Sequence, residues 1–147
     1  MKISTKGDYG LRALIELAHR YGDGKPTQSG EVAARQAIPE SYLEQLLATL
    51  RRAGFLRSVR GPQGGHSLAR PPEQILVSDV IEALEGPIMA VDCLDETNGC
   101  AKDGGCAQSE MWAAVRDAIV GVLSNTTIAD LAERDKLAQP GGARYII

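Results

Sequence analysis

The sequence predicts a mostly α-helical protein with one small β-hairpin, and three observations carry that prediction. Apolar residues recur every three or four positions through much of the first 53 residues, which is the pattern of amphipathic helices. Two short strand-like runs then flank a glycine-rich turn at residues 61–65. A third feature is a long apolar stripe between Met111 and Leu123, which predicts a further helix. Since aromatic residues make up only 4% of the chain, the core is expected to be aliphatic.

The first two helices are expected at residues 5–21 and 29–37. The first carries an apolar face of Leu11, Leu14, Ile15 and Ala18, and Thr5 and Asp8 have the spacing of a capping box. Glycines and Pro26 end it. Ser29 is expected to cap the second helix, whose inward face is Val32, Ala33 and Ala37.

A third helix is expected from about Pro39 to Ala53, and it has two distinct faces. One is an apolar stripe of core residues, Leu43, Leu46, Leu47 and Leu50. The other is polar, with Ser41, Tyr42, Glu44, Gln45, Arg51 and Arg52. Two short helices joined by a tight turn form the helix-turn-helix that lays its second helix in the major groove of DNA. The alternative is that Ser41 and Glu44 form a capping box and contact no DNA.

A basic hairpin follows the third helix directly, with strands expected at 55–60 and 66–70. In this position it is interpreted as a wing. Its arginines, Arg57, Arg60 and Arg70, can reach phosphates or a narrow minor groove, where the negative potential is enhanced. The alternative is an ordinary solvated hairpin. The predicted fold is therefore mostly α with a small β wing: a winged helix-turn-helix domain followed by a long dimerisation helix.

The charge distribution agrees with a nucleic-acid-binding first half. The net charge is −3, yet residues 1–70 hold 11 Lys and Arg against 6 Asp and Glu, while residues 71–147 hold 5 against 13. Binding to double-stranded DNA depends on a local basic surface that neutralises phosphates. An enzyme would need a substrate pocket or an acid-base pair, and the sequence indicates neither, so no enzymatic activity is expected.

The chain has three cysteines, Cys93, Cys100 and Cys106, and all lie in the polar segment CLDETNGCAKDGGC. An odd number cannot pair fully within the chain, and residues 1–9 do not resemble a secretion signal, so a reducing cytoplasm is expected. No run of about 18 apolar residues predicts a membrane span. In a reducing compartment such thiolates hold metals or clusters, or act in redox chemistry. An iron-sulfur cluster is favoured, whereas zinc lacks its usual C-x-x-C pair; uncoordinated thiols are the third alternative.

The stripe at residues 111–123 is expected to form a dimer, because one helix cannot bury such a face alone. A second copy of the chain is the simplest partner, and a two-fold dimer matches palindromic DNA. Packing of the helix back on its own domain is the alternative. Thr127 and Asp130 are expected to cap a final short helix. The resulting organisation is a DNA-binding domain at 1–75, a connecting helix at 76–90, the cysteine segment at 91–108, dimerisation and terminal helices at 109–137, and a flexible tail at 138–147.

Four segments together resemble the Rrf family of winged-helix transcriptional regulators: MKISTKGDYGLRALIELA, SYLEQLLATLRRAG, VRGPQGGHSLAR and LEGPI. The resemblance runs over nearly the whole chain in the right order. It implies that Ser41, Tyr42, Glu44 and Gln45 approach base edges and that Arg60 enters the minor groove. It also implies that the three cysteines hold an iron-sulfur cluster, 2Fe-2S or 4Fe-4S, as in the cluster-binding members.

At the position of the fourth cluster ligand, this sequence differs from one branch of that family. Cluster-binding members of that branch have a histidine three residues after the last cysteine, where this chain has Ser109. The nitric-oxide-sensing members imply a different ligand, an aspartate in the first helix, and Asp8 stands at the matching place. The alternative for Asp8 is a carboxylate stabilised by the helix dipole. Glu110 or an exogenous small ligand also remains open.

The C-terminal tail carries a second resemblance. Its last residues, Tyr145, Ile146 and Ile147, are similar to the isoleucine-ended tails that dock in cysteine synthase, a partner of the cysteine-metabolism regulators of the family. A terminus without a partner is the alternative. The expected function is a homodimeric, sequence-specific regulator, a repressor of palindromic operators, that senses iron-sulfur status, redox state or nitric oxide. A regulator of cysteine metabolism controlled by cysteine synthase is the first alternative, and a small redox or cluster-transfer protein is less favoured.

Overall fold

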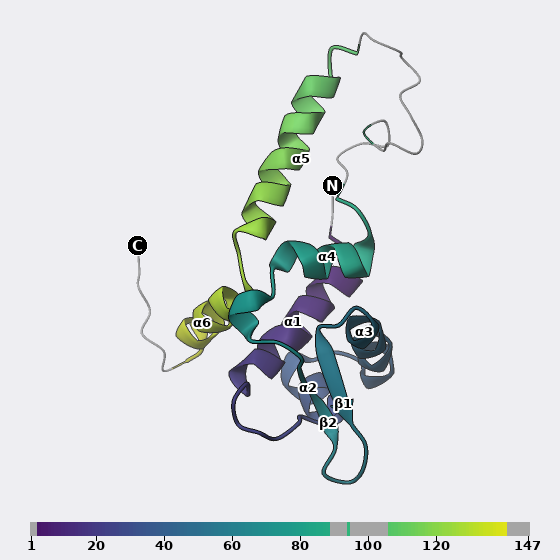
Figure 1. The fold of residues 1–147 in the computed structure, drawn as a ribbon, viewed down its shortest axis with the longest axis vertical. Helices are drawn as coiled ribbons and strands as arrows, with labels where there is room; N and C mark the ends of the chain where they lie inside the picture. The colour runs from purple at the N-terminus through teal and green to yellow at the C-terminus, as the bar shows by residue number, and fades with distance from the viewer. Residues whose placement is uncertain (1–2, 89–93, 95–105, 141–147) are drawn as a thin grey trace.

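The computed structural model describes residues 3–88, 94 and 106–140. In these ranges the fold is mostly helical with one two-stranded antiparallel sheet, which confirms the predicted fold class (Figure 1). The elements are α1 (Thr5–His19), α2 (Ser29–Gln36), α3 (Glu40–Arg52), β1 (Leu56–Val59), β2 (Gly65–Leu68), the short 3-10 helix η1 (Pro72–Gln74), α4 (Val77–Glu85), α5 (Ser109–Ser124) and α6 (Ile128–Ala138).

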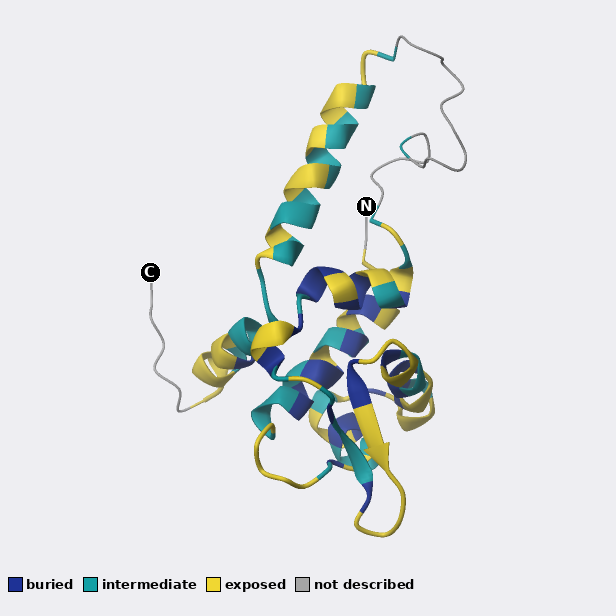
Figure 2. Cartoon of the chain, viewed as in Figure 1, coloured by how far each residue is buried: buried dark blue, intermediate teal, exposed yellow. Residues whose placement is uncertain are grey.

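The aliphatic core lies where α1, α2, α3, α4 and the base of the hairpin meet (Figure 2). The predicted stripe of α3 is at its centre: Leu43, Leu47 and Leu50 are completely buried. α1 contributes Ala13, Leu14 and Leu17. Burial of such side chains stabilises the fold by about 1.5–3 kcal/mol each, so this core fixes how α3 sits on the domain.

The turn between α2 and α3 depends on a left-handed residue. Ala37 has φ 52° and ψ 46°, and the amide of Ile38 then donates to the carbonyl of Ala33 at 3.0 Å. The side chain of Ile38 is buried, and Pro39 precedes the first residue of α3. The tight connection predicted for a helix-turn-helix is therefore present.

The helix caps differ in part from those expected. Thr5 and Asp8 do not cap α1; the N-cap is Ser4, whose hydroxyl accepts from the amide of Lys6 at 3.2 Å. The Glu85 carboxylate at the end of α4 also accepts from the amides of Ser4 at 2.8 Å and Gly7 at 3.1 Å. This distant carboxylate satisfies amides that a helix start leaves without partners.

The other two cap predictions have opposite outcomes. Ser29 does not cap α2, because the N-cap is Gln28, which makes no side-chain cap hydrogen bond. Thr127 and Asp130 do form the expected capping box of α6. The amide of Asp130 donates to the Thr127 hydroxyl at 3.1 Å, and the amide of Thr127 donates to the Asp130 carboxylate at 2.9 Å. Hydrogen bonds from the backbone and side chain of Thr127 lower the pKa of Asp130.

The hairpin is held against the helices by a third extended segment. β1 and β2 pair with Leu56 opposite Leu68 and Arg57 opposite Ser67. On the far side of β2, the amide of Thr27 donates to the carbonyl of His66 at 2.8 Å, and the amide of His66 donates back at 2.7 Å. The loop before α2 thereby anchors the wing to the helical body.

α5 leaves this body, and α6 returns to it (Figure 1). No residue of α5 is buried, whereas Ile128 and Ala132 of α6 are buried, and α6 packs against α1. The junction between α5 and α6 pairs with the start of α4: the amide of Val77 donates to the carbonyl of Thr126 at 2.9 Å. Within the described ranges, no helix is long and apolar enough to cross a membrane.

The anchoring of the wing predicts that Gly65 resists substitution. Gly65 has φ +152°, and a Cβ there would lie 2.4 Å from the carbonyl oxygen of Thr27. Gly65→Ala is expected to lower the free energy of unfolding by about 1–3 kcal/mol, measured by urea denaturation. The matched control is Gly24→Ala. Gly24 also has a positive φ, +72°, but no atom lies within 4 Å of a Cβ added there. Equal losses in the two variants would contradict the close approach at Gly65.

Candidate nucleic-acid interface and cysteine segment

The exposed face of α3 is the centre of the candidate DNA-binding surface. At about 100° per residue, Ser41, Gln45 and Arg52 fall on one line of the helix, opposite the leucine stripe. All three are exposed. The guanidinium of Arg52 donates to the Thr49 hydroxyl at 3.3 Å, while the side chain of Gln45 makes no hydrogen bond within the described ranges. Gln45 is thus available to an external partner.

Tyr42 and Glu44 lie on the two flanks of this line, and each contacts a neighbouring helix. The ring of Tyr42 meets that of Tyr9 of α1 edge to face, with centroids 5.9 Å apart. The Glu44 carboxylate accepts a hydrogen bond from the Ser29 hydroxyl at the start of α2. The capping box considered for Ser41 and Glu44 is wrong, because α3 begins at Glu40 after Pro39 and has no side-chain cap.

The wing tip lies beside the start of α2. Arg60 follows β1 at the tip and is exposed, and the side chain of Gln28 donates to the carbonyl of Pro62 at 3.3 Å. Arg70, at the other end of the hairpin, has its guanidinium 5.3 Å from the centre of the Phe55 ring. Arg60 therefore extends from an anchored tip, while Arg70 stacks on the base of the wing.

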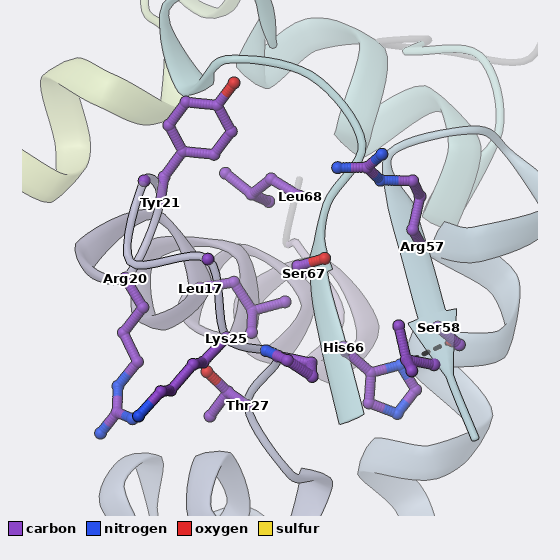
Figure 3. A pocket seen from close by; sticks show the side chains of 14 residues that line it. Leu17, Arg20, Tyr21, Lys25, Thr27, Arg57, Ser58, His66, Ser67 and Leu68 are labelled. Atoms are coloured by element: carbon purple, nitrogen blue, oxygen red, sulfur yellow. Dashed lines mark hydrogen bonds between the residues drawn. The ribbon is translucent and has the colours of Figure 1, made fainter. Parts of the chain in front are cut away.

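Arg57 emerges on a different face from the rest of the predicted set. Side chains alternate along a strand, and Leu56 is in the core. Arg57 consequently projects from the outer face of the hairpin, toward a groove between the hairpin and the α1–α2 loop (Figure 3). The structure groups Ser41, Glu44, Gln45, Arg51 and Arg52 on α3, and it does not bring Arg57 to them.

His66 connects the wing to α3 electrostatically. One ring nitrogen, Nδ1, is 3.0 Å from the Ser58 hydroxyl. Burial lowers the pKa of His66, the Glu44 carboxylate opposes this effect and Arg51 adds to it. A neutral imidazole is thus favoured between the wing and the recognition helix.

The cysteine segment is described only at its end. Cys93 and Cys100 lie outside the described residues, whereas Cys106 is half-buried just before α5. The carbonyl of Cys106 accepts from the Ser109 amide at 3.1 Å and from the Ser109 hydroxyl at 2.9 Å. Ser109, where the family resemblance implies a histidine ligand in one branch, therefore fixes the start of α5. Within the described ranges, no three His, Cys, Asp or Glu side chains group as metal ligands.

Asp8 is exposed in the first turns of α1 and already has a partner. Its carboxylate forms an ion pair with Arg12 at 3.0 Å, and Arg12 also lies 5.5 Å from the centre of the Tyr9 ring. A role for Asp8 as a ligand would require it to leave Arg12. Tyr145, Ile146 and Ile147 of the tail lie outside the described residues.

Several structural residues were missed by sequence reasoning. Tyr9 and Arg12 support Tyr42, and Thr27 anchors His66. The spacing of Tyr9 and Arg12 on α1 did not reveal this role, because the contact of Tyr9 with Tyr42 joins two helices that are distant in sequence. Thr27 is buried in the structure, but a single threonine in a glycine-containing loop gives only a weak sequence signal for an anchoring role.

The comparisons with known proteins decide the family. A family model described as "Rrf2: Iron-dependent Transcriptional regulator" matches residues 3–134. The chain belongs to the Rrf2 family. It is 45% identical over 132 residues to the HTH-type transcriptional regulator CymR of Bacillus subtilis, covering 90% of each chain. It is 32% identical over 145 residues to the regulator IscR of Escherichia coli, covering 99% of this chain and 88% of the relative.

Solved structures of the family agree with the fold. The structure of CymR, the global cysteine regulator of B. subtilis, has a TM-score of 0.80 at 43% identity and covers 91% of this chain and 98% of its own. The structure of T. potens IscR has a TM-score of 0.78 at 40% identity, and the match covers 95% of this chain and 92% of the IscR chain. The resemblance found in the sequence is confirmed, and the chain is a transcriptional regulator of this DNA-binding family.

The geometry of α3 and the wing predicts distinct effects for two substitutions. Gln45→Ala should weaken binding to a specific operator by about 1–3 kcal/mol, since it removes a contact to one base edge. Arg60→Ala should weaken binding to all sequences. It should also reduce the slope of log affinity against log salt concentration by about one, because one charge contact with the DNA backbone is lost. Fluorescence anisotropy against operator and scrambled DNA measures both.

Gln74→Ala and Arg134→Ala are the matched controls, because both residues are exposed on η1 and α6 away from this surface. Operator affinity unchanged in both Gln45→Ala and Arg60→Ala would refute the assigned interface.

Proposed function

We propose that this Rrf2-family regulator is a homodimeric repressor of palindromic operators that senses iron-sulfur status, redox state or nitric oxide through a cluster on Cys93, Cys100 and Cys106. The observation that carries the proposal is the position of the thiols. All the cysteines of the chain lie between α4 and α5, and Cys106 is three residues before α5 begins. Ligand chemistry at that point acts directly on the proposed dimer helix.

Base reading is assigned to the polar line of α3, and Arg60 is assigned to the minor groove, whose enhanced negative potential attracts arginine without reading individual bases. A glutamine such as Gln45 pairs with the N6 and N7 edge of adenine, and a glutamate such as Glu44 accepts from cytosine N4. Ser41 lies on the same line as Gln45, one turn earlier. Tyr42, on one flank, is assigned to base edges with them, as the family resemblance implies. Arg51 on the other flank and Arg52 at the end of the line are placed for the sugar-phosphate backbone, which sets the register of the helix on the duplex.

The dimer is assigned to α5 because this helix leaves an apolar stripe without cover. Met111 is 52% exposed and Val122 is 68% exposed, and both belong to that stripe. Leu123 alone of the stripe packs against the core. A second copy would bury the rest, and it would place two recognition helices about one helical turn of DNA apart, about 34 Å.

The residues present fit an iron-sulfur cluster by their donor chemistry. Three thiolates suit iron, and within the described ranges the sulfur of Cys106 makes no hydrogen bond that would compete. When bound, a cluster with a weak or exchangeable fourth ligand supplies an iron that oxidants and nitric oxide can attack. Asp8 is the proposed fourth ligand, and the release of its carboxylate from Arg12 would accompany binding.

The cluster hypothesis predicts a coloured protein after anaerobic purification. Wild type should carry iron and sulfide with visible absorption, and Cys100→Ala should lose most of both. Asp8→Ala should retain a cluster that is lost faster on exposure to air, whereas Asp23→Ala, a change in an exposed loop, should match wild type. A wild type that stays colourless and iron-free after reconstitution would refute the cluster, and operator binding by the same preparation would leave DNA recognition intact.

Control by cysteine synthase is the second candidate, favoured by the 45% identity to CymR. The chain ends in Tyr145, Ile146 and Ile147, and a terminal carboxylate can be captured by a nest of backbone amides. Immobilised cysteine synthase should retain the full chain and fail to retain a chain lacking Ile147. Equal retention of the two chains would exclude this mode of control.

A further inference from the structure

A groove of about 570 Å³ lies between the α1–α2 loop and the outer face of the wing. Tyr21 and Lys25 line it from the loop, and Arg57 and Ser67 line it from the hairpin (Figure 3). Its size is within the range of small-molecule sites, about 300–1,000 Å³. The predicted DNA contacts on α3 and at the wing tip leave this groove without a role.

The groove combines an apolar wall with cations that lack carboxylate partners. Leu17 and Leu68 form its floor with only 2% and 1% of their surface exposed, and most of the accessible apolar surface comes from Tyr21, which is 45% exposed at its edge. Within the part of the chain that the structure describes, Lys25 and Arg57 form no ion pair. By contrast, the nearby Arg20 is paired with Glu31. Two exposed cations are therefore available to an anion.

Arg57 and Ser67 form the best anchor in this groove. They are directly opposite each other on β1 and β2, so their Cβ atoms are about 4.5–5.5 Å apart. The Ser67 hydroxyl makes no hydrogen bond with another described residue. A guanidinium beside a hydroxyl can hold a carboxylate by paired, charge-assisted hydrogen bonds.

The walls are held in place before any ligand arrives. The two hydrogen bonds between Thr27 and His66, 2.8 and 2.7 Å long, join the loop wall to β2. A preformed site loses little conformational freedom on binding. The same hairpin carries Arg60 at its tip, so a ligand that braces the loop against the hairpin also restricts the wing.

We propose that the groove binds a small organic carboxylate with an apolar body, anchored by Arg57 and Ser67, as an effector that changes operator affinity. The apolar body packs against the exposed ring of Tyr21, over the floor that the nearly buried Leu17 and Leu68 form. Lys25, whose side chain extends along the loop toward Arg20 (Figure 3), adds a longer-range attraction. The effector role rests on the DNA-binding function proposed above, whereas the binding itself does not.

Direct binding is tested by two-dimensional NMR titration of the full-length protein without DNA. Benzoate and hexanoate are the probes, sulfate is the anion without an apolar body, and benzyl alcohol is the body without a charge. Both carboxylates should shift the amide signals of Ser67 and Thr27 with millimolar dissociation constants. Sulfate and benzyl alcohol should bind at least tenfold more weakly.

Variants locate the site. Arg57→Ala should raise the dissociation constant of benzoate about tenfold, and Ser67→Ala or Lys25→Ala should raise it severalfold. The control Lys136→Ala, an exposed lysine on α6, should leave it unchanged. Absence of carboxylate binding would overturn the proposal, and so would sulfate binding as tightly as benzoate, which indicates a site for a DNA phosphate.

The effector role is tested separately by operator affinity with and without saturating benzoate, at constant ionic strength. A change of at least threefold that disappears in Ser67→Ala supports it. Benzoate binding with unchanged operator affinity overturns the effector role. A protein that binds benzoate but no DNA under any condition would refute the proposed function and leave the carboxylate site standing.

Discussion

An apolar helix face that the described part of the chain leaves uncovered is the constraint on which the rest of the molecule depends. α5 has sixteen residues and none is buried, although its stripe runs from Met111 to Leu123. Both ends of the helix are tied to parts with other roles. Cys106 and Ser109 fix its start, and at its end Thr126 pairs with Val77 of α4 while α6 packs on α1. If α5 is the dimer interface, as proposed, a change in how two copies of α5 meet would be transmitted through these ties to the domain that carries α3.

α4, the last described helix before the cysteine segment, ends beside the start of the first helix. Glu85, at the end of α4, accepts hydrogen bonds from the amides of Ser4 and Gly7, and Asp8 follows in the same turn of α1. The end of α4 is thus anchored at the start of α1, and Cys106 is anchored at the start of α5. This arrangement gives a physical reason why chemistry at the thiols would shift both the proposed dimer helix and the proposed DNA-binding domain.

Periodicity predicted the features that are local. The leucine stripe of α3, the hairpin and the apolar stripe of α5 follow from spacings of three, four or two residues, and the capping box of Thr127 and Asp130 follows from a spacing of three. Contacts between distant segments could not be predicted this way. Glu85 is 81 residues from Ser4, yet its carboxylate accepts from the amides of Ser4 and Gly7 at the start of α1. The Asp8 amide that a Thr5 cap would need instead donates to the carbonyl of Ser4. The candidate site shows the same limit, since spacing predicted that Tyr42 and Glu44 leave the core, but their contacts with Tyr9 and Ser29 depend on how three helices pack.

The oligomeric state of α5 variants, measured by sedimentation equilibrium, tests the central claim most directly. Wild type should sediment at twice the chain mass of 15.7 kDa. Val122→Lys, in the exposed stripe, should shift the mass toward that of one chain because it places a charge in the covered face. Asp117→Lys should remain dimeric, since helical spacing places Asp117 on the opposite side of α5. A wild type of 15.7 kDa at micromolar concentration, or a Val122→Lys variant as dimeric as wild type, would contradict the account.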